Sequence, residues 1–168
     1  MSNLIGFIGK GGTGKSTLTA LFLKYVLHSE TKPVLVIDAD ANSSLAELLS
    51  LEADTTIGNI REEVLKKKNA PDLSSISKQE YAEYALHNSI IESIGYDLVV
   101  MGRPPGQGCY CFVNSIVKMM LEKLKKNYKL IVVDCEAGLE HLSRKTLGDM
   151  KQVFIVSDPS RKGVVTGI

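Results

Sequence analysis

The sequence predicts an α/β fold in which a doubly wound, mostly parallel β-sheet carries helices on both faces. One observation is a series of short, near-continuous apolar runs rich in Val and Ile, which is typical of parallel strands buried on both sides. The other is a glycine-rich loop between the first apolar run and a helical pattern. We expect strands at residues 4–8, 34–37, 98–101, 130–133 and 153–156.

Helical patterns separate these strands. We expect helices at residues 16–29, 44–49, 57–68, 78–93, 112–126 and 139–147, with a further helix opening at 160–168. The alternation of strands and helices predicts an open sheet. Ligands of such sheets gather at the carboxyl ends of the strands. The 168 residues suit a single domain at 1–168.

The loop after the first strand matches the phosphate-binding pattern G-x-x-x-x-G-K-[S/T]. Its residues are Gly9, Lys10, Gly11, Gly12, Thr13, Gly14, Lys15 and Ser16. Glycines let the backbone curl so that several N–H groups converge, and the next helix adds its positive end. Lys15 is expected to reach the outer phosphates, and Ser16 to bind Mg²⁺. With Thr17 at the helix start, these residues form the predicted nucleotide-binding set.

Composition excludes several functions. A net charge of +1 gives no electrostatic footprint for nucleic acid. No apolar stretch approaches the roughly 20 residues of a membrane span, so we expect no nucleic acid and no membrane partner. The N-terminus lacks a signal-peptide pattern, because Gly9 and Lys10 interrupt its apolar run. With three cysteines and no such signal, a reducing cytoplasm is the expected location.

Lys10 occupies a position at which a standard phosphate loop does not require lysine. GKGGTGKS resembles the deviant phosphate loop of the MinD/ParA/nitrogenase-iron-protein superfamily of dimeric ATPases. The resemblance implies that Lys10 reaches across a dimer interface to the partner's nucleotide, as an arginine finger does. It therefore implies an ATP-dependent homodimer with catalytic Lys10 and Lys15. The alternative for Lys10 is a solvated surface lysine.

The same resemblance covers the whole chain, whereas relatives continue by roughly another third. We therefore expect a single P-loop ATPase domain that lacks its C-terminal third and exposes apolar surface.

The second strand ends in Asp38-Ala39-Asp40. In the superfamily an Asp-x-Asp here is the first switch, which implies that Asp40 positions or activates the attacking water and that Asp38 lies in the Mg²⁺ shell. The alternative is that an Asp here only caps the next helix. Family members often carry Pro where this chain has Ala41, which leaves the conformation of the loop less defined.

Asp134 follows four apolar residues in the Walker B pattern, so its carboxylate is expected to face the Mg²⁺ site. Residues 135–141 would form the second switch, with Gly138 turning a backbone N–H toward the γ-phosphate. No Asn-Lys-x-Asp guanine signature is present, which favours ATP over GTP.

Cys109 and Cys111 form a Cys-x-Cys pair. A disulfide between thiols so close in sequence would be strained, whereas two thiolates suit Zn²⁺, Ni²⁺ or Cu(I). A two-fold axis would bring two such pairs into one four-sulfur site. The alternative is a pair of ordinary cysteines at a helix start.

Together with the phosphate loop and residues 134–142, this pair resembles the CooC family of ATPases, which help to insert nickel into carbon monoxide dehydrogenase and related enzymes. The resemblance implies Ni²⁺ or Zn²⁺ at a dimer-shared site and a client metalloenzyme of that type. Residues 104–109 also resemble the cluster segment of the nitrogenase iron protein. Its second cysteine is replaced here by His141, so a shared iron–sulfur cluster is not expected. Cys135 is expected to pack in the core.

The sequence thus leaves open which task ATP hydrolysis serves. The leading hypothesis is a dimeric ATPase for nickel insertion. The alternatives are a spatial organiser like MinD or ParA, an iron–sulfur reductase-like ATPase, and a fragment without function.

Overall fold

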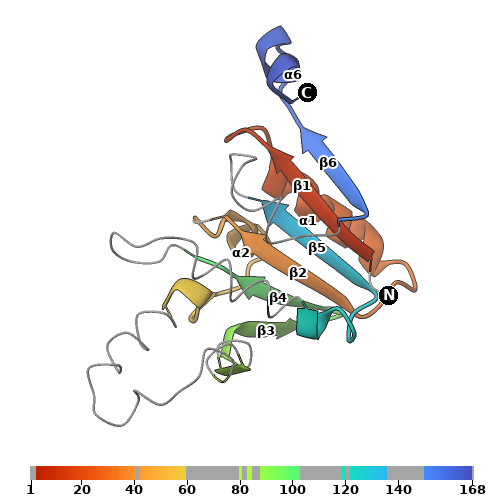
Figure 1. Cartoon of the computed structure of the whole chain (residues 1–168), viewed down its shortest axis with the longest axis vertical. Helices are drawn as coiled ribbons and strands as arrows, with labels where there is room; N and C mark the ends of the chain where they lie inside the picture. Colours follow the sequence, from red (N-terminus) through yellow and green to blue (C-terminus); the bar gives the residue numbers. More distant parts are fainter. Residues whose placement is uncertain are drawn as a thin grey trace.

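The structure is a computed structural model that describes residues 3–40, 42–59, 80, 83–84, 88–102, 119, 122–135 and 150–167. Within these residues the elements follow one another along the chain as drawn in Figure 1. They are β1 (Asn3–Gly9), α1 (Lys15–Leu27), β2 (Val34–Ala39), α2 (Ser44–Leu48), β3 (Ile90–Ser93), β4 (Tyr96–Val100), β5 (Leu130–Cys135), β6 (Gln152–Val156) and α6 (Arg161–Gly167).

The strands form one sheet in the order β3-β4-β2-β5-β1-β6 (Figure 1). All neighbouring pairs are parallel except β3 and β4. The mostly parallel sheet predicted from the apolar runs is therefore confirmed. The carboxyl ends of β1, β5 and β2 lie side by side at one edge of the sheet, which is where ligands bind in open α/β folds.

Strand β3 corrects the predicted helix at 78–93. Residues 90–93 pair antiparallel with β4, with Ile90 opposite Val99, and Gly95 takes a positive φ of 89° in the connecting turn. This is a hairpin with a two-residue turn, which the helical pattern concealed. The described residues at 80, 83–84 and 88–89 are helical as expected, and so are 57–59, 119 and 122–124. The predicted helix at 139–147 lies outside the described residues.

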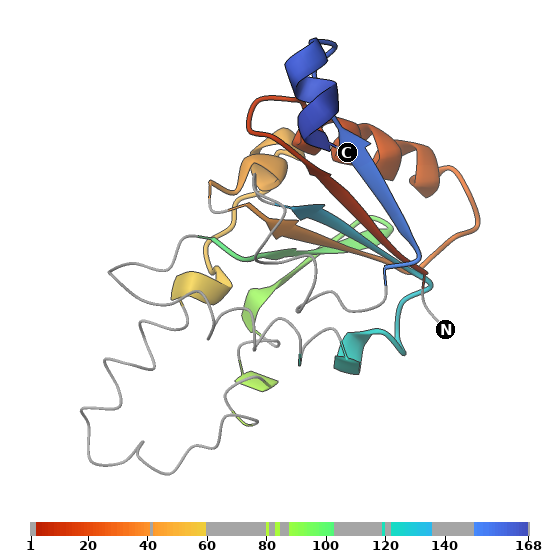
Figure 2. The same cartoon turned by 45° about the horizontal axis from the view of Figure 1, so that its top comes forward.

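Each face of the sheet carries its own apolar core. Helix α1 lies along one face (Figure 2), where its Leu23 and Val26, with Leu45 of α2, belong to a buried cluster with side chains of the strands. On the other face, Ile57 and Leu124 contribute to a second cluster with side chains of β1, β2 and β5. Both β2 and β5 are buried along their whole length. They form the buried centre of the sheet, with Asp38 and Asp134 near its carboxyl end.

Edge strand β6 is parallel as predicted, but it is not covered on both faces. Its side chains Val153, Phe154 and Ile155 are 44%, 38% and 54% exposed, and only Val156 is buried. Within the described residues, β6 has a strand partner on one side only. We find no helix, in the part of the chain that the structure describes, whose length and hydrophobicity would allow it to cross a membrane.

Candidate functional site

The predicted phosphate loop connects the end of β1 to the start of α1. Gly12 and Gly14 adopt positive φ angles of 77° and 88°, a conformation that residues other than glycine rarely adopt. A Cβ atom at either position would project into open space, so backbone strain rather than crowding selects glycine there. The loop thus has the tight left-handed turns that a phosphate-binding loop requires.

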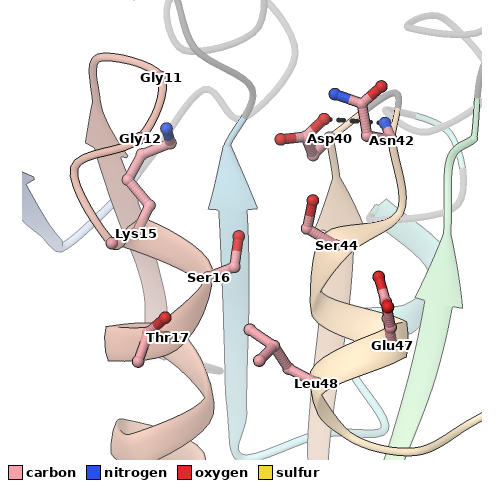
Figure 3. A pocket seen from close by; sticks show the side chains of 11 residues that line it. Gly11, Gly12, Lys15, Ser16, Thr17, Asp40, Asn42, Ser44, Glu47 and Leu48 are labelled. Atoms are coloured by element: carbon pink, nitrogen blue, oxygen red, sulfur yellow. Dashed lines mark hydrogen bonds between the residues drawn. The ribbon is translucent and has the colours of Figure 1, made fainter.

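The loop forms one wall of a pocket of about 840 Å³ (Figure 3). Residues from α2 and from the segment after β2 form the facing wall. The lining residues are Gly11, Gly12, Gly14, Lys15, Ser16 and Thr17 on the first side, and Asp40, Asn42, Ser44, Glu47 and Leu48 on the second. The structure therefore brings most of the predicted nucleotide-binding set together with Asp40. Lys10 does not line this pocket.

The side chain of Lys15 is 5% exposed although it carries a charge. Its Nζ donates a hydrogen bond of 2.9 Å to the carbonyl oxygen of Lys10, and the Thr13 hydroxyl donates to the same oxygen at 2.9 Å. A neutral carbonyl is a weaker partner for an ammonium group than a phosphate oxygen. The pocket therefore holds a preplaced cation that an anionic ligand can attract.

Asp38 is the penultimate residue of β2, and it is fully buried. Its Oδ1 accepts a hydrogen bond of 3.1 Å from the Asp40 N–H, and its Oδ2 accepts from Leu45 and Ala46 at 3.0 and 3.1 Å. Burial raises the pKa of Asp38 to about 6, against the lowering effect of these N–H groups. Both carboxylate oxygens thus hold the loop after β2 and the first turn of α2.

Asp134 lies directly opposite Asp38 in the β2–β5 register and is equally buried. Its Oδ1 is 3.4 Å from the Thr19 hydroxyl, whereas its Oδ2 has no hydrogen-bond partner. Burial raises the pKa of Asp134, and a hydrogen bond from Ser16 and the charge of Lys15 lower it. A buried carboxylate that interacts with the Ser16 side chain and has one unpartnered oxygen fits a divalent cation of the Mg²⁺ type.

Asp40 is half-buried on the wall that faces the phosphate loop (Figure 3). Its Oδ1 accepts a hydrogen bond of 2.8 Å from the Asn42 N–H, which closes a local turn of the chain. This contact engages one carboxylate oxygen. The side chain of Asp40 thus lines the pocket opposite the phosphate loop, with its other carboxylate oxygen outside this hydrogen bond.

The predicted metal-binding pair cannot be placed. Cys109 and Cys111 lie outside the described residues, as do Gly138 and His141. Among the described residues no group of three or more His, Cys, Asp or Glu side chains could hold a metal ion. Cys135 packs in the core as expected, and burial raises its pKa to about 12, which keeps the thiol protonated and unreactive.

Sequence reasoning predicted Asp40 on the second wall of the pocket but missed the part of that wall contributed by α2. Ser44, Glu47 and Leu48 reach it from α2, and Thr19 contacts Asp134 from α1. One signal could have indicated the wall: Ser44 and Glu47 have the S-x-x-E spacing of a helix start, directly after the strand-end carboxylates. No local sequence pattern predicts the contact between Thr19 and Asp134, because these two residues are far apart in the sequence.

Comparisons with known proteins agree with this geometry. A family model described as an AAA domain matches residues 4–167. An uncharacterized ATP-binding protein of Methanocaldococcus jannaschii is 40% identical over 97% of this chain, which covers 64% of that protein. The carbon monoxide dehydrogenase accessory protein CooC of Rhodospirillum rubrum is 27% identical over 96% of this chain, which covers 65% of CooC. The chain therefore spans about two thirds of the length of these relatives.

Solved structures show the same fold at low identity. The Cyanothece protein McdA has a TM-score of 0.65 and 20% identity, with 98% of this chain and 62% of McdA covered. The cell division ATPase MinD of Pyrococcus furiosus has a TM-score of 0.63 and 20% identity, with 99% of this chain and 64% of MinD covered. The chain therefore belongs to this AAA domain family and has the P-loop NTPase fold of the ParA and MinD ATPases.

Proposed function

We propose that the protein binds and hydrolyses ATP and that nucleotide-driven dimerisation serves nickel insertion into a metalloenzyme of the carbon monoxide dehydrogenase type. The observation that carries the ATPase part is the pocket itself. A glycine-rich loop with a buried lysine faces Asp40 across a pocket of about 840 Å³. The carboxylate of Asp134 interacts with Ser16 and has one oxygen without a hydrogen-bond partner. This arrangement suits a nucleotide whose phosphates lie along the loop.

Each residue has a distinct task in this proposal. Backbone amides of the loop and the Lys15 ammonium bind the phosphates. The Ser16 hydroxyl and the Asp134 carboxylate would hold Mg²⁺, which neutralises phosphate charge when bound. Asp40 orients the attacking water and accepts its proton. Asp38 holds the loop that carries Asp40, since its oxygens are already engaged by backbone amides; a place in the Mg²⁺ shell stays a prediction for this residue.

Calorimetry tests the ATPase part. Magnesium-ATP should bind the protein, and Lys15→Ala should weaken binding at least 100-fold, because a buried, charge-assisted phosphate contact is lost. Lys24→Ala is the matched control, since Lys24 is an exposed lysine on the same helix, away from the pocket. Equal affinities of the two variants would contradict the assignment of the pocket.

The nickel part rests on the similarity to CooC and on the Cys109/Cys111 pair in the sequence. Equilibrium dialysis should show Ni²⁺ or Zn²⁺ bound by the ATP-loaded dimer at one ion per two chains. The double variant Cys109→Ser/Cys111→Ser should lose this binding, whereas Cys135→Ala should keep it. Unchanged metal binding in the double variant would remove the metal role. A visible absorbance band after anaerobic purification would instead favour the iron–sulfur alternative.

A spatial organiser is the second candidate, supported by the fold shared with MinD. Such a protein would associate with DNA or a membrane when ATP is bound. Co-sedimentation with DNA and with anionic vesicles separates the two functions. ATP-dependent pelleting of the protein, together with absent metal binding, would favour this second candidate.

A further inference from the structure

Lys10 and Asp158 follow the carboxyl ends of two neighbouring strands. Strand β1 pairs in parallel with β6, and the last pair in the register is Gly9 opposite Val156. Lys10 is the next residue after β1, and Asp158 is the second residue after β6. The topology therefore brings together two oppositely charged residues that are far apart in the sequence.

The two backbones are in close contact at this point. A Cβ atom at Gly9 would lie 2.0 Å from the carbonyl oxygen of Val156, and Gly9 also has a φ of 151°. No other residue fits this position without displacing one strand. The start of the phosphate loop is thus anchored directly against the segment that carries Asp158.

The carboxylate of Asp158 is itself held in place. Its Oδ1 accepts a hydrogen bond of 2.9 Å from the Ser160 N–H, and the Ser160 hydroxyl accepts one of 3.0 Å from Gly163. A Cβ atom at Gly163 would lie 2.6 Å from the carboxylate, so glycine leaves the room that the carboxylate occupies. The contacts with Ser160 lower the pKa of Asp158, and the positive charge of Lys10 lowers it further.

We propose that Asp158 is a positioning residue that attracts the Lys10 ammonium in the nucleotide-free subunit. This inference deepens the proposed function, because it rests on Lys10 acting in a partner's site. An attraction between single charges at the protein surface, here an exposed lysine and a partly exposed aspartate, is weak and is screened by salt. A polyphosphate presents more negative charge to the lysine, so a partner's nucleotide can draw Lys10 away from Asp158.

The interaction itself can be tested on the nucleotide-free protein. Carbon-detected NMR of the side-chain carboxyl group gives the pKa of Asp158 directly. Lys10→Gln should raise this pKa, because the attracting charge is removed, and added salt should shrink the difference. Lys24→Gln is the control and should leave the pKa unchanged. An identical pKa in wild type and Lys10→Gln would overturn the inference, whatever the protein does with ATP.

The consequence for dimerisation has its own test. Asp158→Asn keeps an oxygen acceptor for the Ser160 N–H and removes only the charge. Sedimentation with magnesium-ATP should show dimerisation about two- to five-fold tighter than in wild type, and this gain should vanish in the Lys10→Gln background. Glu30→Gln removes an exposed charge on the loop after α1 and should have no effect. An equal gain with and without Lys10 would overturn the inference. A wild-type protein that never dimerises would instead refute the proposed role of Lys10 in trans, while the NMR result still decides the pairing with Asp158.

Discussion

Strands β2 and β5 each carry an aspartate near their carboxyl end, at paired positions of the sheet, yet the two aspartates have different hydrogen-bond partners. Asp38 and Asp134 are paired in the strand register and are both fully buried. Three backbone N–H groups, one from the loop after β2 and two from α2, bind Asp38, whereas Asp134 has a long contact with Thr19 and one oxygen without a hydrogen-bond partner. The difference separates a carboxylate that builds the site from one that is available to a ligand.

The cause of this difference is the chain that follows each strand. After β2, the backbone turns back over the strand end and begins α2 within hydrogen-bonding distance of Asp38. Asp134 instead faces α1, which offers it the side chains of Ser16 and Thr19. Backbone amides are obligatory hydrogen-bonding groups, so Asp38 satisfies donors that would otherwise be buried without a partner.

The strongest test of the comparison is one isosteric substitution made at both positions. Asp38→Asn places an NH₂ group against backbone donors, so the free energy of unfolding should fall by about 2–4 kcal/mol. Asp134→Asn loses the attraction of the Lys15 charge but also removes a carboxylate whose burial outweighs its favourable contacts, as its raised pKa indicates. Its unfolding free energy should therefore stay within about 1 kcal/mol of wild type or rise. Urea unfolding at pH 7 measures both.

For nucleotide binding we expect the opposite ranking, with the larger effect in Asp134→Asn. Asp134→Asn should abolish the contribution of Mg²⁺ to nucleotide affinity, measured by calorimetry with and without the metal. Equal loss of stability in the two variants would show that the two strand ends do not differ as their hydrogen bonds indicate.

The pH dependence of stability should report on the same pair. The pKa of Asp38 is about 6 in the folded protein and near 3.8 when unfolded, so between these values the folded state binds more protons. Stability from this group is fully present below pH 3.8 and is lost as the pH rises through 6, by roughly 2–3 kcal/mol. The raised pKa of Asp134 acts in the same direction.

Urea unfolding from pH 4 to 7 checks this expectation. Asp38→Asn should flatten the slope, because the contribution of Asp38 is removed while the contributions of the other groups remain. A slope that is unchanged in Asp38→Asn would assign the pH dependence to other groups.

The sequence was informative where a local pattern and a topological rule act together. The phosphate loop, Asp38 and Asp134 each follow an apolar strand, and parallel strands bring their ends to one edge. The hairpin at β3 was missed because Ile90 and Ile91 also fit a helical pattern, and only pairing with β4 decides between the two. The proximity of Lys10 and Asp158 depends on strand order, which no local pattern encodes.

The smallest expected effect concerns the long contact between Thr19 and Asp134. The Thr19 hydroxyl lies 2.9 Å from the Lys15 carbonyl oxygen within α1 and 3.4 Å from Asp134 Oδ1. Its proton is therefore shared between a short hydrogen bond to the backbone and a long one to Asp134. Thr19→Val keeps the shape and removes both, and the unfolding free energy should fall by about 1 kcal/mol or less. Magnesium-ATP affinity should change by less than about three-fold, because Asp134 meets a ligand through its other oxygen. A loss of unfolding free energy as large as that of Asp38→Asn would mean that the contact of Asp134 with α1 stabilises the fold as much as the backbone hydrogen bonds of Asp38.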